Sequence, residues 1–434
     1  MLTITSYKKC LIVCFVGILL ALCFHHFISQ KIKFVTYNDG YLKIQDYAYY
    51  IIIAKAFWFE GFGNIYEIYF QQQALSMHIG AQIYYVMPLG ITPIALVVWL
   101  PFAYVARFSM ALSYTLWSAF SLGFLFISLW SVFRYAFQLK KLTLLPIALS
   151  FVNLFSLHIL LSIYGGQTSV LAAGLLVHLI YIMHRTATKS QSDNWLLIVL
   201  LIFLLGIKPP HIALGLGLLL VYGRWREALY SVVIVLVVLI GITPMLSVEW
   251  VPSYFKILPM YSRKDVPNIY AWSISLGTMN IFRSAYRSII GENIAVFVSF
   301  FVTYGVYLSV VGISVLSKIR GKSIDKLFPL KVTKEQLFVL LVASYLLFAP
   351  YAGGYEDILF LPIFIMVLLC GNTPPLTSFK SLTLTFILFV ILLHTLFPPN
   401  KPLWLLWLLK ALILGYMLNF CRIEPQNNEI SEEV

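Results

Sequence analysis

Long apolar segments, each about as long as a membrane is thick, follow one another along this chain and constrain its fold more than any other feature. A helix needs about 20 apolar residues to cross the hydrocarbon core of a bilayer. Because 61% of the 434 residues are hydrophobic and 11% are charged, the core of a soluble domain could not bury them. The sequence therefore predicts an all-α, polytopic integral membrane protein. Candidate spans lie near 10–29, 88–106, 112–133, 143–162, 167–184, 194–207, 209–223, 228–246, 293–317, 336–350, 355–371, 380–397 and 402–420.

The distribution of Lys and Arg predicts the side of the membrane on which each connection lies. Lys8 and Lys9 precede the first segment, which has no cleavage site of small residues, so we expect an uncleaved first helix and a cytoplasmic N-terminus. The basic connections "FRYAFQLKK", "HRTATK", "GRWRE" and "SKIRGKSIDK" are also expected in the cytoplasm. With both ends inside, we predict about 12 (11–13) crossings. The proline-containing stretch 73–112 could be a span, a re-entrant segment or an interfacial segment.

The domain organisation predicted from these spans is simple. Residues 1–421 form one membrane-embedded unit, and the acidic residues 422–434 form a short cytoplasmic tail. Two long loops, about 30–87 and 247–292, are expected on the non-cytoplasmic side. Most of the unusual polar residues lie in these loops or in turns on the same side.

Composition also argues against several classes of site. The net charge of +13 is explained by helix orientation and by contact with anionic lipid head groups, so we expect no nucleic-acid partner. The histidines are scattered, and we predict no metal site and no required cofactor. The five cysteines lie in or at the ends of apolar segments, without the spacing of a disulfide framework or a zinc site.

An acid followed by aromatic residues opens the first long loop, in "DYAYYIIIAKAFWFEGFGNIYE". Aromatic side chains at this density are typical of the membrane interface, so we expect a helix over about 46–60 that lies along the membrane surface. Gly61 and Gly63 are expected to end it. Asp46 could be a helix N-cap, or a functional acid at the lipid boundary, where a carboxylate is costly unless it is paired or used.

Several short motifs occur in an order that resembles the polyprenol-phosphate-mannose-dependent alpha-mannosyltransferase family. They are the "DYAYY" stretch with its later "GNIY", then "YYVMPLGITPIALVVWLPFA", "IYGGQTSVLAAGLL", "LGIKPPHIALGLGLLL" and "LLFAPYAGGYEDILFLPIF". The resemblance covers about residues 10–370, and the shared order carries it more than any single motif. Met87-Pro88-Leu89 departs from the double proline that relatives often carry, which leaves the local backbone open.

This resemblance implies a membrane glycosyltransferase of the GT-C class. Such an enzyme takes a hexose, here expected to be mannose, from a polyprenyl phosphate and transfers it to a glycolipid or glycan acceptor. The resemblance assigns Asp46 as the catalytic base, with inversion at the sugar carbon. It also implies a location in a cell membrane, expected to be a bacterial inner membrane, with the active site facing the periplasm.

Four basic residues are candidates for binding the donor phosphate. Lys208, in "GIKPPH", lies between two apolar runs, where a lysine is costly; it could instead extend to the membrane surface. His211 is the second candidate, or a packed polar residue. Arg263 and Arg283, in the second long loop, could grip a phosphate with two donors or be solvated.

Three further residues are candidates for binding the sugar or the acceptor, namely Tyr50, Gln167 and Tyr355. Next to Tyr355, Glu356 is more simply interpreted as an acid at the start of a helix in an outside loop. Two other functions stay open from the residues. A transporter or flippase of a lipid-linked saccharide would show internal repeats, which we do not find. A non-catalytic subunit of an envelope-assembly complex would tolerate the loss of Asp46.

Overall fold

The structure is a computed structural model, and it describes most of the central helices of the chain. The described residues are 35–38, 41–44, 46–80, 89–136, 163, 167–188, 194–257, 289–321, 324, 332–349, 354–370 and 403–420. The predicted spans 10–29, 143–162 and 380–397 and the predicted tail 422–434 lie outside them.

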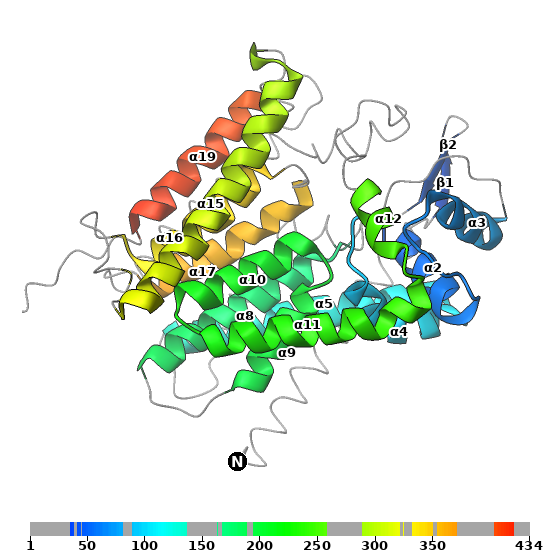
Figure 1. The fold of residues 1–434 in the computed structure, drawn as a ribbon, viewed down its shortest axis with the longest axis horizontal. Helices are drawn as coiled ribbons and strands as arrows, with labels where there is room; N and C mark the ends of the chain where they lie inside the picture. The colour runs from blue at the N-terminus through cyan, green and yellow to red at the C-terminus, as the bar shows by residue number, and fades with distance from the viewer. Residues whose placement is uncertain are drawn as a thin grey trace, which may run out of the picture.

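The N-terminal part combines one small hairpin with two helices (Figure 1). Strands β1 (Val35–Asn38) and β2 (Tyr41–Ile44) pair antiparallel, with Val35 opposite Ile44. Helices α2 (Asp46–Phe59) and α3 (Ile68–Ile79) follow. The fold is therefore helical, as predicted, except for this two-stranded hairpin. Helix α2 ends where expected, since Gly61 has a φ of +76°, which favours glycine.

A helix forms where one was predicted for 46–60, and it is buried among other helices, while its orientation along the membrane surface stays a prediction. Tyr47, Ala48 and Ile53 are each at most 2% exposed, although they point in different directions around the helix. A helix that is apolar on all sides is normally enclosed by other helices. Here α3 and α4 (Ile94–Ala106) pack against it, and Trp58 Nε1 donates a hydrogen bond of 2.8 Å to the carbonyl of Leu96.

Most of the remaining helices form the bundle in the left and centre of Figure 1, whereas α12 (Trp250–Ile257) contacts the segment between α2 and α3. After α4, they are α5 (Met110–Ala136), α8 (Ser169–Thr188), α9 (Trp195–Leu205), α10 (Pro209–Val221), α11 (Trp225–Leu246), α12 (Trp250–Ile257), α15 (Glu292–Arg320), α16 (Lys334–Phe348), the 3-10 helix η4 (Gly354–Leu359), α17 (Phe360–Cys370) and α19 (Leu403–Phe420). Helices thus occupy the predicted spans that lie among the described residues.

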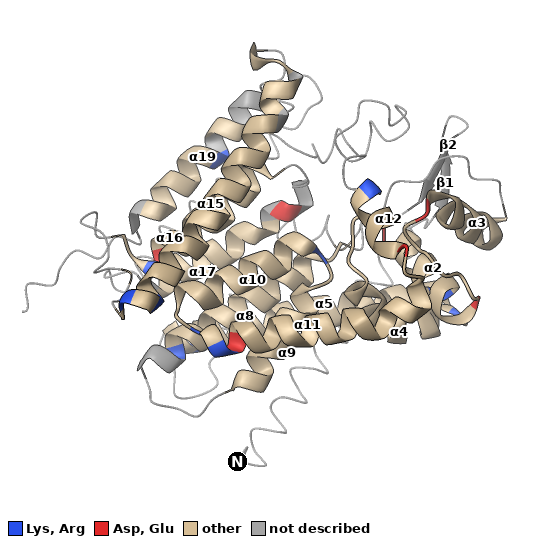
Figure 2. Ribbon diagram, viewed as in Figure 1, with Lys and Arg blue, Asp and Glu red and all other residues tan. Residues whose placement is uncertain are grey.

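Three of the described helices are long and apolar enough to cross a membrane, namely Met110–Ala136, Trp225–Leu246 and Asn293–Arg320. Helices α11 and α15 expose large apolar side chains such as Ile240 and Phe297 along their outer faces. Figure 2 shows that the described Lys, Arg, Asp and Glu residues lie mostly at helix ends, and that the helix bodies carry few charges. This pattern is that of a membrane protein. The number of crossings stays a prediction.

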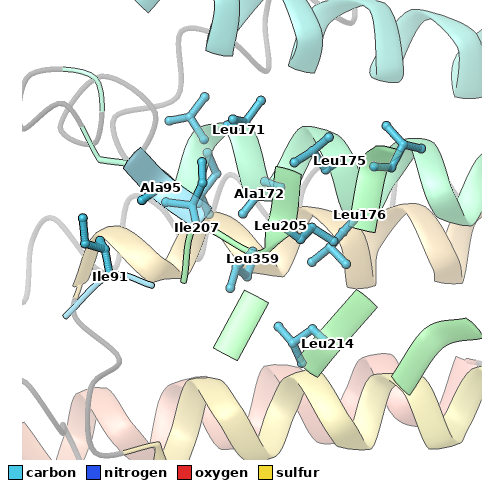
Figure 3. Packing of buried hydrophobic residues seen from close by; sticks show 14 of the residues in the cluster. Ile91, Ala95, Leu171, Ala172, Leu175, Leu176, Leu205, Ile207, Leu214 and Leu359 are labelled. Carbon is cyan, nitrogen blue, oxygen red and sulfur yellow. The ribbon is translucent and has the colours of Figure 1, made fainter. Parts of the chain in front are cut away.

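Helix α8 is the centre of the core. Helices α5, α9, α10 and α17 and the turn η4 all pack against it. Figure 3 shows Leu171, Leu175 and Leu176 of α8 beside Leu205 of α9 and Leu359 of η4. Because α8 is enclosed, a polar residue at either of its ends is held in place by several neighbouring helices.

Helices α8 and α10 lie side by side and run in the same direction. At one end, Lys208 Nζ lies 3.4 Å from Gln167 Oε1. At the other, Tyr222 Oη lies 3.0 Å from His184 Nε2. From residue 167 to residue 184 the helix rises about 25 Å, so the pair carries two well-separated groups of polar residues.

Candidate functional site

Polar side chains from four separate segments meet at the Gln167 end of this helix pair. Asp46 lies in the first turn of α2, and Glu356 lies in η4. Gln167 lies two residues before the start of α8, and Lys208 is the residue before α10. His211, in the first turn of α10, is the fifth member. We call these five residues the polar cluster.

A continuous chain of contacts joins the five side chains. Gln167 Nε2 donates to Asp46 Oδ2, and Lys208 Nζ lies 3.4 Å from Gln167 Oε1. Lys208 Nζ also forms an ion pair with Glu356 Oε1 at 3.0 Å. His211 Nε2 lies 2.9 Å from the other oxygen, Glu356 Oε2. The Gln167 amide is thus placed with its nitrogen toward a carboxylate and its oxygen toward an ammonium group, as its donors and acceptor require.

The sequence around Lys208 explains why this lysine points into the cluster. Pro209 follows it, and a residue before proline avoids helical geometry, so Lys208 is extended (φ −121°, ψ 135°). Pro209 then begins α10, a position that suits proline because its missing N–H would have no partner there. The turn is fixed to the start of α4, since Thr92 N donates to Ile207 O at 3.0 Å and Thr92 Oγ1 donates to Gly206 O.

Glu356 is the most deeply buried charge in the cluster, with 1% of its side chain exposed. Burial alone would raise the pKa of this carboxyl group, but the charges of Lys208 and His211 and their hydrogen bonds outweigh it. The pKa of Glu356 is therefore held below its ordinary value, and the group is a carboxylate at neutral pH. The side chain of Lys208 is also largely buried, with 13% exposed. Each of these two charges therefore compensates the other in a site with little access to water.

Asp46 has two roles available at its position. It lies in the first turn of α2, where a negative charge is stabilised by the helix dipole. Its contact with Gln167 also connects it with Lys208. The role of Asp46 as a functional acid stays a prediction.

The structure brings together four of the residues predicted for the site, namely Asp46, Gln167, Lys208 and His211. Tyr50 lies one turn further along α2, where its ring stacks on Trp99 with centroids 4.9 Å apart. The remaining predicted residues cannot be placed in this way. Tyr355 lies in η4, with a side chain outside the described part, and Arg263 and Arg283 lie outside the described residues.

Glu356 is the functional candidate that sequence reasoning missed. The sequence favours an acid at a helix start in an outside loop over a sugar contact, but Glu356 is buried and bridges Lys208 and His211. One signal could have found it. A lysine between two apolar runs needs an opposite charge, and the chain contains only 17 Asp and Glu residues. Few of these lie next to an apolar segment on the side of the membrane predicted for Lys208.

The polar cluster has the groups needed for acid–base chemistry next to an anionic substrate. The Asp46 carboxylate can accept a proton, and the Lys208 ammonium group can stabilise negative charge. Among the described residues, no group of three or more His, Cys, Asp and Glu side chains is placed to hold a metal ion.

Comparison with known proteins gives one match. Residues 92–325 match glycosyltransferase family 87. No curated protein and no solved structure matches the chain. The matched region is more than half of the 434 residues and contains Gln167, Lys208 and His211, while Asp46 and Glu356 flank it. The chain therefore belongs to glycosyltransferase family 87 and is a membrane glycosyltransferase.

Proposed function

We propose that this protein transfers a hexose from a polyprenyl phosphate to a hydroxyl group of a glycolipid or glycan, with mannose as the first candidate sugar. The contact chain from Asp46 through Gln167 to Lys208 carries the proposal, because it places a base and a cation on either side of one amide. The proposed location is a bacterial inner membrane, with the site at its periplasmic face.

The proposed reaction needs one base and one good leaving group. Asp46 takes the proton of the acceptor hydroxyl while that oxygen attacks the anomeric carbon of the sugar. The bond between this carbon and the phosphate oxygen breaks, and its electron pair leaves with the phosphate. Attack from the face opposite the phosphate inverts the configuration, and a phosphate leaves without the acid that an alkoxide would need.

The other members of the polar cluster would prepare Asp46 and Lys208 for these steps. The amide of Gln167 holds one oxygen of Asp46 and so orients the carboxylate that would accept the proton. Lys208 stabilises the negative charge that develops on the departing phosphate. Glu356 keeps Lys208 and His211 in place before the substrate arrives, so it is a positioning residue.

The experiment that tests this function uses membranes containing the full chain or its Asp46→Asn variant. Radiolabelled polyprenyl-phosphate mannose and an extract of envelope glycolipids are supplied, and labelled product is counted at equal protein abundance. We expect transfer by the parent and a loss of about 10²–10⁴-fold in the variant, the usual contribution of a general base. Tyr222→Phe, at the opposite end of the helix pair, is the matched control and should transfer like the parent.

Equal transfer by the parent and Asp46→Asn would mean that Asp46 only stabilises the start of α2, and the catalytic assignment would be wrong. If neither form transfers label, mannose is not the sugar that this protein carries. The same assay with other hexoses linked to polyprenyl phosphate then identifies the donor. Failure with all of them would contradict the proposed donor class.

A further inference from the structure

Two buried hydroxyl groups without hydrogen-bond partners lie at the end of α8 that carries Gln167. Thr168 is 1% exposed and Ser169 is fully buried, and neither Oγ atom makes a hydrogen bond with any residue that the structure describes. Thr168 is the N-cap, because Ala172 N donates to its carbonyl at 2.9 Å. A threonine in this position usually accepts a hydrogen bond from an amide of the first turn through its side chain. Thr168 does not.

Such unpaired hydroxyls are destabilising, and hydroxyls within helices usually avoid the problem. In α5, for example, Thr115 Oγ1 and Ser128 Oγ each donate to the carbonyl four residues earlier, at 2.8 Å. A buried polar atom without a partner next to a charged cluster is therefore most simply explained by a ligand that supplies the partner.

The charges of the polar cluster show what this ligand would need. The charge of Lys208 is already balanced by Glu356, and Asp46 adds a further negative charge. An anionic substrate therefore needs hydrogen-bond donors beyond Lys208. The N-terminus of a long helix provides them, because its first amides have no partners within the helix and its dipole favours negative charge.

Helix α8 is better suited to this role than α10, which also begins at the cluster. Helix α10 starts with Pro209 and Pro210, which have no N–H groups, and the amides of His211 and Ile212 both donate to Lys208 O. The first turn of α8 contains no proline, and it adds the two unpaired hydroxyls.

We propose that the hydroxyls of Thr168 and Ser169, together with the first-turn amides of α8, bind the phosphate group of the lipid-linked donor. Lys208 supplies the positive charge, and the hydroxyls supply neutral donors that Glu356 does not compete for. The identity of the ligand rests on the proposed function, since that function is what brings a phosphate to the cluster. The observation of two unpaired, buried hydroxyls beside Gln167 is independent of it.

The test measures binding of a short-chain polyprenyl monophosphate to the full protein in lipid nanodiscs, beside the polyprenol of the same length. We expect Thr168→Val together with Ser169→Ala to weaken phosphate binding about tenfold or more, because hydrogen bonds to a charged group are lost. Binding of the polyprenol should stay unchanged. Thr168→Ser, which keeps a hydroxyl, should bind like the parent.

Ser121→Ala is the matched control for removal of a buried hydroxyl. Ser121 Oγ, in α5, is also buried without a hydrogen-bond partner. We expect its variant to bind the phosphate like the parent, and all variants to elute as the parent does in size-exclusion chromatography. The proposal is overturned if the double variant binds the phosphate as tightly as the parent. Equal weakening by Ser121→Ala, or equal weakening for the polyprenol, also overturns it.

Asp46→Asn separates this inference from the proposed function. We expect this variant to bind the polyprenyl phosphate but not to transfer sugar. If the parent binds the phosphate through the two hydroxyls but transfers no hexose, the phosphate site stands and the proposed function fails. If the parent transfers and the double variant transfers and binds equally well, the function stands and the phosphate site is wrong.

Discussion

The two ends of the α8–α10 pair carry similar residue types but are built in different ways. The polar cluster at one end contains Lys208, His211 and Glu356. At the other end His184, Tyr222, Lys334 and Glu335 meet, and we call them the Tyr222 cluster. Tyr222 Oη lies 3.0 Å from His184 Nε2 and 3.3 Å from Glu335 Oε1, and Lys334 Nζ lies 4.7 Å from the centre of the Tyr222 ring.

The start of helix α16 explains much of the Tyr222 cluster. Lys334 and Glu335 are the first residues of α16, and a capping box precedes them, in which Thr333 Oγ1 accepts from Gln336 N at 3.1 Å. The charged pair is adjacent in sequence and 3.8 Å apart. In the polar cluster, Lys208 and Glu356 come from distant segments. The two clusters therefore cannot be told apart by their residue types. The polar cluster differs in having a charge pair between distant segments and unpaired hydroxyls nearby.

The largest expected difference between the two clusters is in stability. Glu356→Gln should lower the free energy of unfolding by about 3–5 kcal/mol, because Lys208 is left as an uncompensated buried charge. Glu335→Gln should lower it by only about 1 kcal/mol, since Lys334 reaches water. Denaturant unfolding of each variant in the same detergent measures both values. Equal losses would contradict the distinction between the two ends.

A double-mutant cycle should sharpen the same distinction. Lys208→Met combined with Glu356→Gln should recover about 2 kcal/mol relative to the sum of the single losses, because no buried charge is left without its partner. For Lys334→Met with Glu335→Gln we expect less than about 1 kcal/mol, since the Lys334 side chain is 36% exposed. Additive losses at Lys208 and Glu356 would show that their ion pair is not coupled.

The pH dependence of stability should differ between the parent and Glu356→Gln. The pKa of Glu356 is lower in the folded protein than its ordinary value of 4.5. The stability contributed by its carboxylate is therefore fully present above pH 4.5 and is lost as the pH falls below this value. The free energy of unfolding of the parent minus that of Glu356→Gln should stay constant between about pH 6 and 8. It should then shrink by up to about 1.4 kcal/mol per pH unit below pH 4.5. Unfolding curves of both proteins across this range measure it, and a difference that grows in acid would reverse the sign of the shift.

The smallest effect is expected at the helix cap of the Tyr222 cluster. Thr333→Ala removes the side-chain acceptor of the capping box and should cost about 1 kcal/mol. Sugar transfer in the assay described for Asp46 should stay within about twofold of the parent, because this cap is far from the polar cluster. Thr333→Ser keeps the hydroxyl and should retain stability. A large loss of transfer in Thr333→Ala would show that the two ends are coupled.

The helices were predictable from sequence because each apolar run is too long for a typical strand and is bounded by polar or turn residues. Asp46, Gln167, Lys208 and His211 were identified because polar residues stand out in apolar surroundings, but their mutual contacts could not be predicted. Glu356 was missed since an acid before an apolar helix is the usual pattern at helix starts. The burial of α2 was missed because aromatic residues suit a membrane interface and a protein core equally well. Strands β1 and β2 were not predicted.

The hydrogen bonds of Thr92 have a mechanical consequence for the site. They fasten the turn that holds Lys208 to the start of α4, and α4 also packs against α2, which holds Asp46. Asp46 and Lys208 are thus both connected to α4, so a displacement of α4 would move both side chains. Under the proposed function, the distance between the base and the phosphate-binding lysine would therefore depend on α4.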